Sequence, residues 1–351
     1  MTVPELTLTE LLSPGPLLLL DAKGRPAAPF ACIDLDRVRE GSAEADVHQA
    51  AQALGRPHVP LVGTATQPPE GPGVALAEAL DLTLVQGKQE ESLPRTCIAV
   101  RDVAEAVQQL RSATVARPLT VATLCQTLRL TAALPVAQGL VVESLAYSML
   151  LASEEFAEWR GKTPRREPRY HSPSVLVNRN EAGLEVLLAH PARRNAYSRE
   201  MRDGLVEALE LVAWDSSIKW VRLAGQGPTF CSGGDLDEFG SIDDVATAHL
   251  IRLRQGAGVA LEGVRDRVTV QLHGACIGAG IEIPAFAAHV SAAPGTTLRL
   301  PELAMGLIPG AGGTVSITRR IGRWRTAWLA ISGTSIGPER ARAWGLVDEV
   351  G

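Results

Sequence analysis

Hydrophobic and polar residues follow a regular pattern in the second half of the chain. Apolar residues flank an Asn-Glu-Ala-Gly turn over 174–190, which predicts two strands joined by a hairpin. Apolar residues recur at helical spacing over 198–215, after a serine suited to capping, and predict an amphipathic helix. A strand at 219–225, a loop at 228–240 and a helix at 243–263 follow, before the strand of "RVTVQLHG". Strands that alternate with helices predict an α/β fold with a largely parallel sheet.

The first half shows a weaker pattern. It predicts strands at 29–36 and 59–65, and a short helix that runs into a strand over 74–85. Three further helices are predicted at 102–111, 118–130 and 134–160. Residues 161–173, "GKTPRREPRYHSP", are rich in Pro and Arg and have no apolar periodicity. We interpret this stretch as a linker that divides the chain.

Composition and charge exclude several classes of protein. The 351 residues are 46% hydrophobic, which is enough for one large domain or two modest ones. The 34 basic and 39 acidic residues give a net charge of −5, so the basic face of a nucleic-acid-binding protein is not expected. No apolar run approaches the roughly 18–20 residues that span a bilayer, and no signal peptide is recognised. Five cysteines without CxxC spacing predict a reduced, cytoplasmic protein without a zinc site.

A glycine-rich turn, "GACIGAGIE" at 274–282, lies between an apolar strand and an apolar helix. In outline it is similar to a dinucleotide-binding turn, and Glu302 follows Glu282 after twenty residues. The dinucleotide pattern G-x-G-x-x-G requires a third glycine, but Ile283 stands at that position, and no Walker loop is present. A nucleotide site is therefore not expected, and the glycines need another explanation.

Five short motifs occur in order along the second half. They are "HPARRNAYSREM" (190–201), "FCSGGDL" (230–236), "GACIGAGIE" (274–282), "PELAMGLIPGAGG" (301–313) and "GLVDEV" (345–350). In this order and spacing they closely resemble the crotonase superfamily, the enoyl-CoA hydratase/isomerase family, over about 174–351. The resemblance implies an α/β fold, a spiral of ββα repeats with a helical region for a lid and for assembly. It also implies an enzyme that stabilises the enolate of an acyl-CoA thioester.

The resemblance assigns roles to individual residues. The backbone N–H groups of Ser232 and Ala279 are expected to form an oxyanion hole for the thioester oxygen. Glu302 is expected to be the main base and acid, while Glu282 positions and polarises a water molecule. No metal or separate cofactor is expected, because coenzyme A is part of the substrate. Residues expected to bind coenzyme A or the acyl group are Ala192, Arg194, Ala196, Gly233, Gly234, Asp235, Leu236 and Gly278, together with Phe156 and Arg160 at the adenine end.

The first half carries a fainter resemblance to the second. Residues 56–85 are similar to 265–292 in their order of strand, glycine loop, short helix and strand. Residues 116–160 resemble the helices that end members of the family, whereas the printed sequence ends just after "GLVDEV". We predict that 1–160 is a degenerate crotonase-like half, whose tail helices fold back to cover and support a catalytic core at 174–351. The alternatives are chance similarity and an unrelated helical domain used for assembly.

The predicted function is that of an enoyl-CoA hydratase, which adds water across the 2,3 double bond of an enoyl-CoA thioester. One alternative is another reaction through the same oxyanion hole, a double-bond isomerisation or a thioester hydrolysis. Another is a pseudoenzyme or scaffold that binds coenzyme A without turnover. The expected partner is an acyl-CoA, with neither nucleic acid nor membrane, and the expected assembly is a homo-oligomer, either a trimer or derived from a trimer. The acyl chain is not defined by the sequence.

Overall fold

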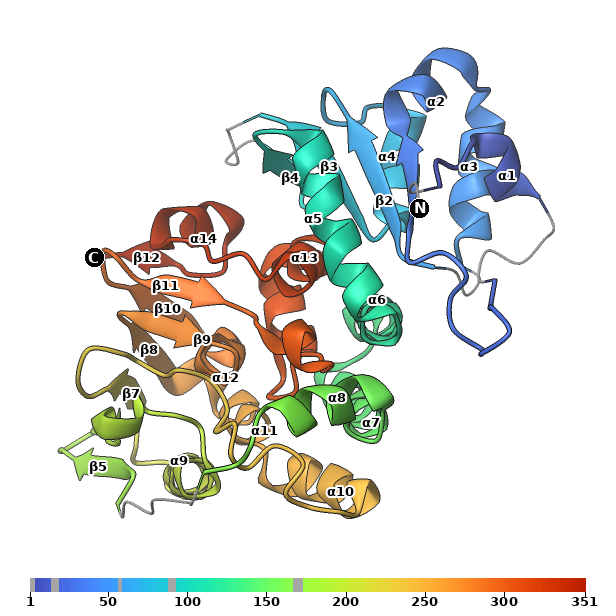
Figure 1. The fold of residues 1–351 in the computed structure, drawn as a ribbon. Helices are drawn as coiled ribbons and strands as arrows, with labels where there is room; N and C mark the ends of the chain where they lie inside the picture. Colours follow the sequence, from blue (N-terminus) through green and yellow to red (C-terminus); the bar gives the residue numbers. More distant parts are fainter. Residues whose placement is uncertain (1–3, 14–18, 56–58, 88–92, 167–172) are drawn as a thin grey trace.

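Two sheets form the framework of the computed structural model, which describes residues 4–13, 19–55, 59–87, 93–166 and 173–351 (Figure 1). The larger sheet has six strands in the order β12-β10-β8-β7-β6-β5, and all neighbours are parallel except β5 and β6. The strands are β5 (Val175–Arg179), β6 (Gly183–Leu188), β7 (Trp220–Gly225), β8 (Val268–Leu272), β10 (His289–Ala292) and β12 (Glu349–Val350). The hairpin predicted at 174–190 and the strand at 219–225 are confirmed.

Helices and a small second sheet complete this half of the chain. The small sheet pairs β9 (Ala275–Ile277) with β11 (Thr297–Arg299) in parallel. The helices are α9 (Arg199–Trp214), α10 (Val245–Gln255), α11 (Ala257–Glu262), α12 (Ala279–Glu282), α13 (Gly313–Ser332) and α14 (Pro338–Trp344), with short 3₁₀ turns at Pro191–Arg193, Arg265–Arg267, Pro284–Phe286 and Glu302–Met305. The single helix predicted at 243–263 is wrong, because Gly256 has an extended backbone that separates α10 from α11.

The first half contains a parallel four-stranded sheet in the order β1-β2-β3-β4. Its strands are β1 (Ala31–Asp34), β2 (Leu61–Ala65), β3 (Leu82–Gln86) and β4 (Cys97–Val100). Its helices are α1 (Leu8–Leu12), α2 (Leu35–Gly41), α3 (Glu44–Ala53), α4 (Pro72–Ala79) and α5 (Val103–Ala116). The strands predicted at 29–36 and 59–65 are confirmed, as is the helix that leads into a strand at 74–85.

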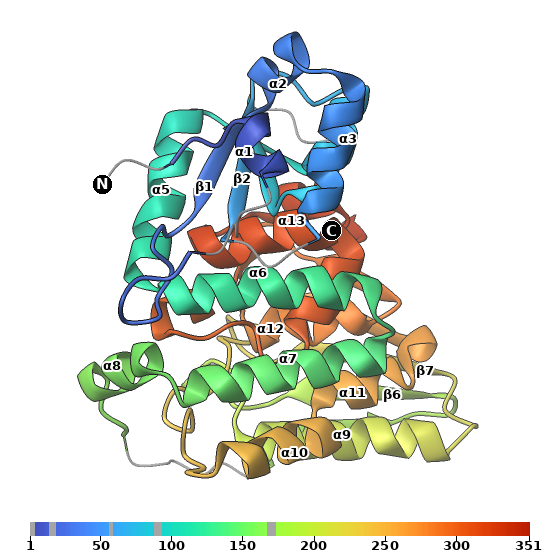
Figure 2. The ribbon, with the colours of Figure 1, turned by 90° about the vertical axis from the view of Figure 1, so that its right-hand side faces the viewer.

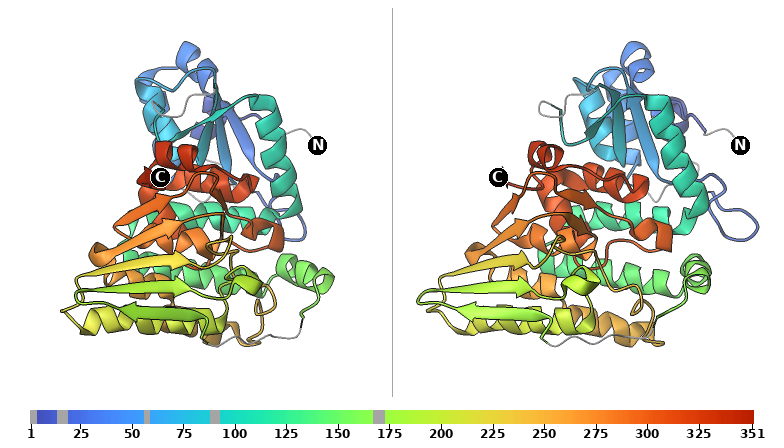
Figure 3. Two further views of the ribbon diagram at one scale, coloured as in Figure 1. Left: turned by 90° about the vertical axis from the view of Figure 1, so that its left-hand side faces the viewer. Right: turned by 60° about the vertical axis from the view of Figure 1, so that its left-hand side comes forward.

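Three helices connect the two sheets. They are α6 (Pro118–Ala133), α7 (Val136–Leu151) and α8 (Glu154–Lys162). The single helix predicted at 134–160 is therefore wrong, because α7 and α8 meet at a bend of 62°. Figures 2 and 3 show α6 and α13 between the two sheets, and α7 beside α10 and α11.

One hydrophobic core runs through both halves of the chain. It includes Leu84 and Leu124 from the first half, and Leu184, Val270 and Ile317 from the second. A smaller cluster fills the space between the four-stranded sheet and α1 to α4. Residues 161–162 of the predicted linker end α8, and 167–172 lie outside the described residues. Residues before and after the linker therefore pack into the same hydrophobic core.

All five cysteines are buried and unbridged, and burial raises the pKa of the Cys231 thiol to about 12. Within the described ranges, no group of His, Cys, Asp and Glu could hold a metal ion. No single described helix is long and apolar enough to cross a membrane, although the bent pair of α7 and α8 passes the same test by length and composition.

Candidate functional site

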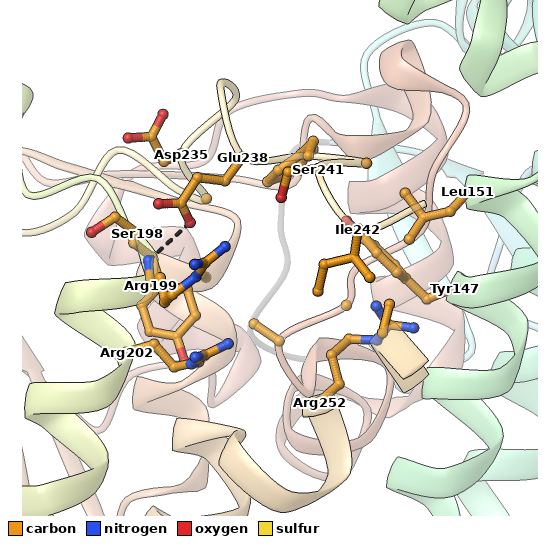
Figure 4. A pocket seen from close by; sticks show the side chains of 18 of the residues that line it. Tyr147, Leu151, Ser198, Arg199, Arg202, Asp235, Glu238, Ser241, Ile242 and Arg252 are labelled. Atoms are coloured by element: carbon orange, nitrogen blue, oxygen red, sulfur yellow. Dashed lines mark hydrogen bonds between the residues drawn. The ribbon is translucent and has the colours of Figure 1, made fainter. Parts of the chain in front are cut away.

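A cavity of about 200 Å³ lies between α7, α9 and α10 and the loops that precede α12 and α13 (Figure 4). It is lined by Tyr147, Leu151, Tyr197, Ser198, Arg199, Arg202, Gly234, Asp235, Glu238, Phe239, Gly240, Ser241, Ile242, Ala248, Arg252, Ala279, Glu282, Glu302, Gly310 and Ala311. The glycine-rich turn, both predicted carboxylates and a helix of the first half thus meet at one place.

The glycine-rich turn lies tightly against the loop that follows β7. Cys231 donates its N–H to the Ala275 carbonyl at 3.2 Å, and Ile277 donates to the Cys231 carbonyl at 3.0 Å. A Cβ on Gly280 would stand 2.5 Å from the same Cys231 carbonyl oxygen, so only glycine permits this approach. The turn and the loop therefore present their backbones side by side at the cavity.

One residue of each of these segments lines the cavity and has a backbone N–H that is not used within the fold. Ala279 begins α12, so its N–H has no acceptor within the helix, and Ala279 lines the cavity. Gly234 lines the cavity too, while the Gly233 carbonyl and the Asp235 N–H on either side of it pair with Tyr197. In the described part of the chain, no acceptor takes the Gly234 N–H.

The prediction that Ser232 supplies an oxyanion-hole donor is wrong. Its N–H donates to the Arg194 carbonyl at 3.0 Å, so it is already used to hold the 190–201 segment. Gly234, two residues further on, lines the cavity, and its N–H has no acceptor among the described residues, so it is the better candidate for this donor.

Glu282 is 2% exposed and held by the loop before α13. Its Oε2 accepts hydrogen bonds from the N–H groups of Ala311 at 2.7 Å and Gly313 at 3.0 Å. Burial raises the pKa of Glu282 well above its usual range, and the neighbouring Glu302 and Glu143 carboxylates raise it further, against these two donors. The second oxygen, Oε1, is left to face the glycine-rich turn.

Glu302 approaches the same turn from the start of the 3₁₀ turn Glu302–Met305. A Cβ on Gly278 would stand 2.4 Å from its Oε1 and 3.7 Å from Oε1 of Glu282, so both carboxyl groups lie beside this glycine. Its Oε2 is buried, and no described residue donates to it. Burial raises the pKa of Glu302 to about 8. The structure therefore brings the two predicted carboxylates together and leaves one buried oxygen of Glu302 without a donor among the described residues.

A third buried carboxylate, Glu143, comes from α7 in the first half. Its Oε1 accepts from Gly312 N–H at 2.7 Å, and its Oε2 accepts from the N–H and hydroxyl of Thr314 at 2.9 and 2.7 Å. Burial raises the pKa of Glu143 to about 7. None of the five sequence motifs includes this residue. The available signal was a lone glutamate within the apolar helix 136–151, since a buried carboxylate requires partners.

Some of the remaining predicted binding residues line the cavity, and others do not. Asp235 lines the cavity, but both of its carboxylate oxygens accept from Arg193 at 2.8 Å. Phe156 is 5% exposed and packs against Trp159, and its predicted contact with adenine stays a prediction. Arg160 donates to the Leu236 carbonyl at 2.7 Å. None of the following residues lines the cavity: Ala192, Arg194, Ala196, Gly233, Leu236, Gly278, Phe156 and Arg160.

Comparisons with known proteins agree with this geometry. The sequence model of the enoyl-CoA hydratase/isomerase family matches residues 178–351, which contain both carboxylates and both N–H groups. A 2,3-dehydroadipyl-CoA hydratase of Escherichia coli (strain K12) is 32% identical over 176 residues, which cover 50% of this chain and 68% of that protein. The chain belongs to the enoyl-CoA hydratase/isomerase family, a part of the crotonase superfamily.

Two further similarities concern the same half of this family member. A mevalonyl-coenzyme A hydratase of Beauveria bassiana (strain ARSEF 2860) is 31% identical over 199 residues, 53% of this chain and 69% of that protein. The crystal structure of an enoyl-CoA hydratase from Thermoplasma volcanium GSS1 is 28% identical, with a TM-score of 0.47, over 51% of this chain and 72% of that one. The match to the family model assigns a crotonase-like fold to residues 178–351, and residues 1–177 lie outside that match.

Proposed function

We propose that the protein is an enoyl-CoA hydratase. The observation that supports this proposal is the pair of buried carboxyl groups, Glu282 and Glu302, on either side of Gly278. Addition of water requires a group that takes a proton from water and a group that holds the water in place. Isomerisation or thioester hydrolysis does not require both, so the intact pair favours hydration.

In the proposed reaction, the N–H groups of Gly234 and Ala279 bind the thioester oxygen. Ionised Glu302 takes a proton from a water molecule held by Glu282, while the water oxygen bonds to the β-carbon. The electron pair of the double bond moves towards the thioester oxygen, where the two N–H groups stabilise the negative charge. Glu302 then returns the proton to the α-carbon. The product has gained one water molecule, the enzyme is regenerated, and no separate cofactor takes part.

Mass spectrometry of the protein with a panel of enoyl-CoA thioesters tests this proposal. A gain of one water, about 18 Da, is expected with wild type and is lost in Glu302→Gln, which keeps the shape of the side chain but not its basicity. The matched control is Glu210→Gln, because Glu210 lies on the exposed face of α9. Acyl-CoA binding without any mass gain would contradict hydration and favour isomerisation, hydrolysis or a pseudoenzyme.

We further propose that the tail helices, at 116–160, complete the site within one chain. We also propose that the protein forms homo-oligomers, as predicted from the sequence. Three residues of α7 support the first point: Glu143 binds the loop before α13, and Tyr147 and Leu151 line the cavity. The strands of both sheets lie in chain order, and all of β1 to β4 and all of the larger sheet except β5 are parallel, which supports the related proposal that 1–160 is a degenerate crotonase-like half. Size-exclusion chromatography with light scattering tests the oligomeric state.

A further inference from the structure

Two arginines face each other across the cavity. Arg202 extends from α9 and Arg252 from α10, and Figure 4 shows them on opposite sides of the open space. Both also line a smaller cavity of about 80 Å³, which is bounded by Gly256, Ala257 and the loop at 310–312. The arginines therefore stand where the two cavities adjoin.

Arg252 has only neutral hydrogen-bonding partners among the described residues. Its Nε donates to the Ser144 hydroxyl at 3.1 Å, its Nη2 donates to the Ser148 hydroxyl, and its guanidinium lies 4.9 Å from the ring centre of Tyr147. These contacts fix its position and leave Nη1 without an acceptor in the described part of the chain. Burial lowers the pKa of Arg252 from its usual value, yet a guanidinium stays charged at any ordinary pH.

The carboxylates nearest to these arginines are already engaged. Arg202 pairs with Asp203 through its Nε and Nη2, at 2.8 and 2.7 Å. Glu143 acts on Arg252 electrostatically, but its two oxygens accept the hydrogen bonds of Gly312 and Thr314. A partly buried cation without a hydrogen-bonded counter-charge is costly, and a bound anion relieves that cost.

We propose that the acyl group of the substrate ends in a carboxylate, which binds between Arg202 and Arg252. This inference rests on the proposed function, because the thioester must lie at Gly234 and Ala279 for its acyl chain to reach the arginines. A carboxylate there accepts from two fixed guanidinium groups, each of which makes strong charge-assisted hydrogen bonds. A methyl group at the same place leaves Arg252 desolvated and unpaired. Arg202 and Arg252 thus determine specificity for the acyl end.

Binding of saturated acyl-CoA thioesters tests the inference separately from catalysis. Titration calorimetry compares thioesters of four, six and eight carbons that end in a carboxylate with thioesters of equal length that end in a methyl group. At the length that spans the cavity, wild type is expected to bind the carboxylate form about 10- to 100-fold more tightly. Arg252→Met and Arg202→Met are each expected to abolish most of this preference, and Arg252→Lys to restore part of it.

The control is Arg254→Met, because Arg254 lies on the same helix, is exposed and pairs with Glu210 instead of lining the cavity. It is expected to keep the wild-type preference, which separates the specific effect from the loss of one positive charge on α10. Equal binding of both series by wild type, or tighter binding of the methyl series, overturns the inference. If the carboxylate series binds selectively but no thioester gains water, the inference stands and the hydratase proposal fails.

Discussion

At the scale of single residues, Gly278 has two independent reasons to be glycine. Its φ of +50° lies in a region that other residues rarely adopt, and a Cβ would stand 2.4 Å from Oε1 of Glu302. The first reason concerns the backbone of the turn, and the second concerns the position of the carboxyl group that we propose to be catalytic. A pair of glycine substitutions can separate them.

Gly278→Ala is expected to displace the Glu302 carboxyl group and lower kcat by about 100-fold, since misplacement of a reacting group by 1 Å has that order of effect. Gly295→Ala is the matched control, because Gly295 also has a positive φ of +81° but open space around its Cβ position. It is expected to cost about 1 kcal/mol of stability and leave kcat unchanged. Equal losses of kcat in the two variants would show that strain alone accounts for the effect.

Burial of Glu302 also makes stability depend on pH. Its pKa is raised from 4.5 to about 8 in the folded chain, so between these values the native state binds more protons than the unfolded state. The free energy of unfolding therefore falls as pH rises from about 5 to 8, by roughly 2–4 kcal/mol, and levels off above that. Thermal unfolding across this range should show a smaller fall in Glu302→Gln. An unchanged slope in that variant would assign the effect to other groups.

The same pKa fixes the direction of the pH dependence of activity. Hydration as proposed starts from ionised Glu302, so kcat/KM is expected to rise with pH and approach a plateau above about 8. Initial rates measured from pH 6 to 9 provide the profile. A rate that declines over this range would mean that protonated Glu302 is the reactive form.

At the scale of elements, the loop at 310–314 joins α7, α12 and α13. Its N–H groups alternate between two carboxylates, with Ala311 and Gly313 on Glu282 and Gly312 and Thr314 on Glu143. A shift of α7 would therefore move this loop and, with it, Glu282 of the proposed catalytic pair. A change at Glu143 should therefore act on Glu282 through this loop.

Glu143→Gln removes one negative charge and places an amide N–H against the Thr314 N–H, so it should loosen the loop. We expect a tenfold or greater loss of kcat, and a shift of the acid limb of the pH profile to lower pH, because Glu143 raises the pKa of Glu282 and Glu302. Glu155→Gln is the matched control, because Glu155 accepts two N–H groups and a hydroxyl at Leu119 and Thr120 in the same way. A similar pH shift in the control would exclude a specific role for Glu143.

At this scale, local sequence patterns define some features of the site, and tertiary contacts define the others. Local patterns predicted the strands at 174–190 and 219–225 correctly, and the motif positions brought Glu282 and Glu302 together. The choice between Ser232 and Gly234 depended on which N–H pairs with the neighbouring segment, and local spacing does not define that. Glu143 lies well over a hundred residues before its partners, so only the tertiary fold reveals its role.

At the scale of the whole molecule, hydrogen bonds between α6, with the residue that follows it, and α13 connect the two halves. Thr131 donates to the Thr314 carbonyl at 2.8 Å, and Arg319 donates to the Leu134 carbonyl at 2.6 Å. Further along α13, Arg323 forms a contact of 3.7 Å with the buried Asp81 beside β3. Together with the shared hydrophobic core, these bonds indicate that α13 requires the first half to bury its surface.

Cleavage of the chain at residue 172 tests this dependence. The fragment 173–351 is expected to be poorly folded and inactive alone, since it lacks α6 and α7 against α13 and the carboxylate of Glu143. Circular dichroism, thermal unfolding and the hydration assay provide the measurements, and co-expression with 1–166 is the control that restores the missing helices. Recovery of folding and activity on co-expression would show that the first half acts through its contacts and not through chain continuity. A stable, active 173–351 fragment would instead mean that the family fold is complete without α7, and that the two halves merely adjoin.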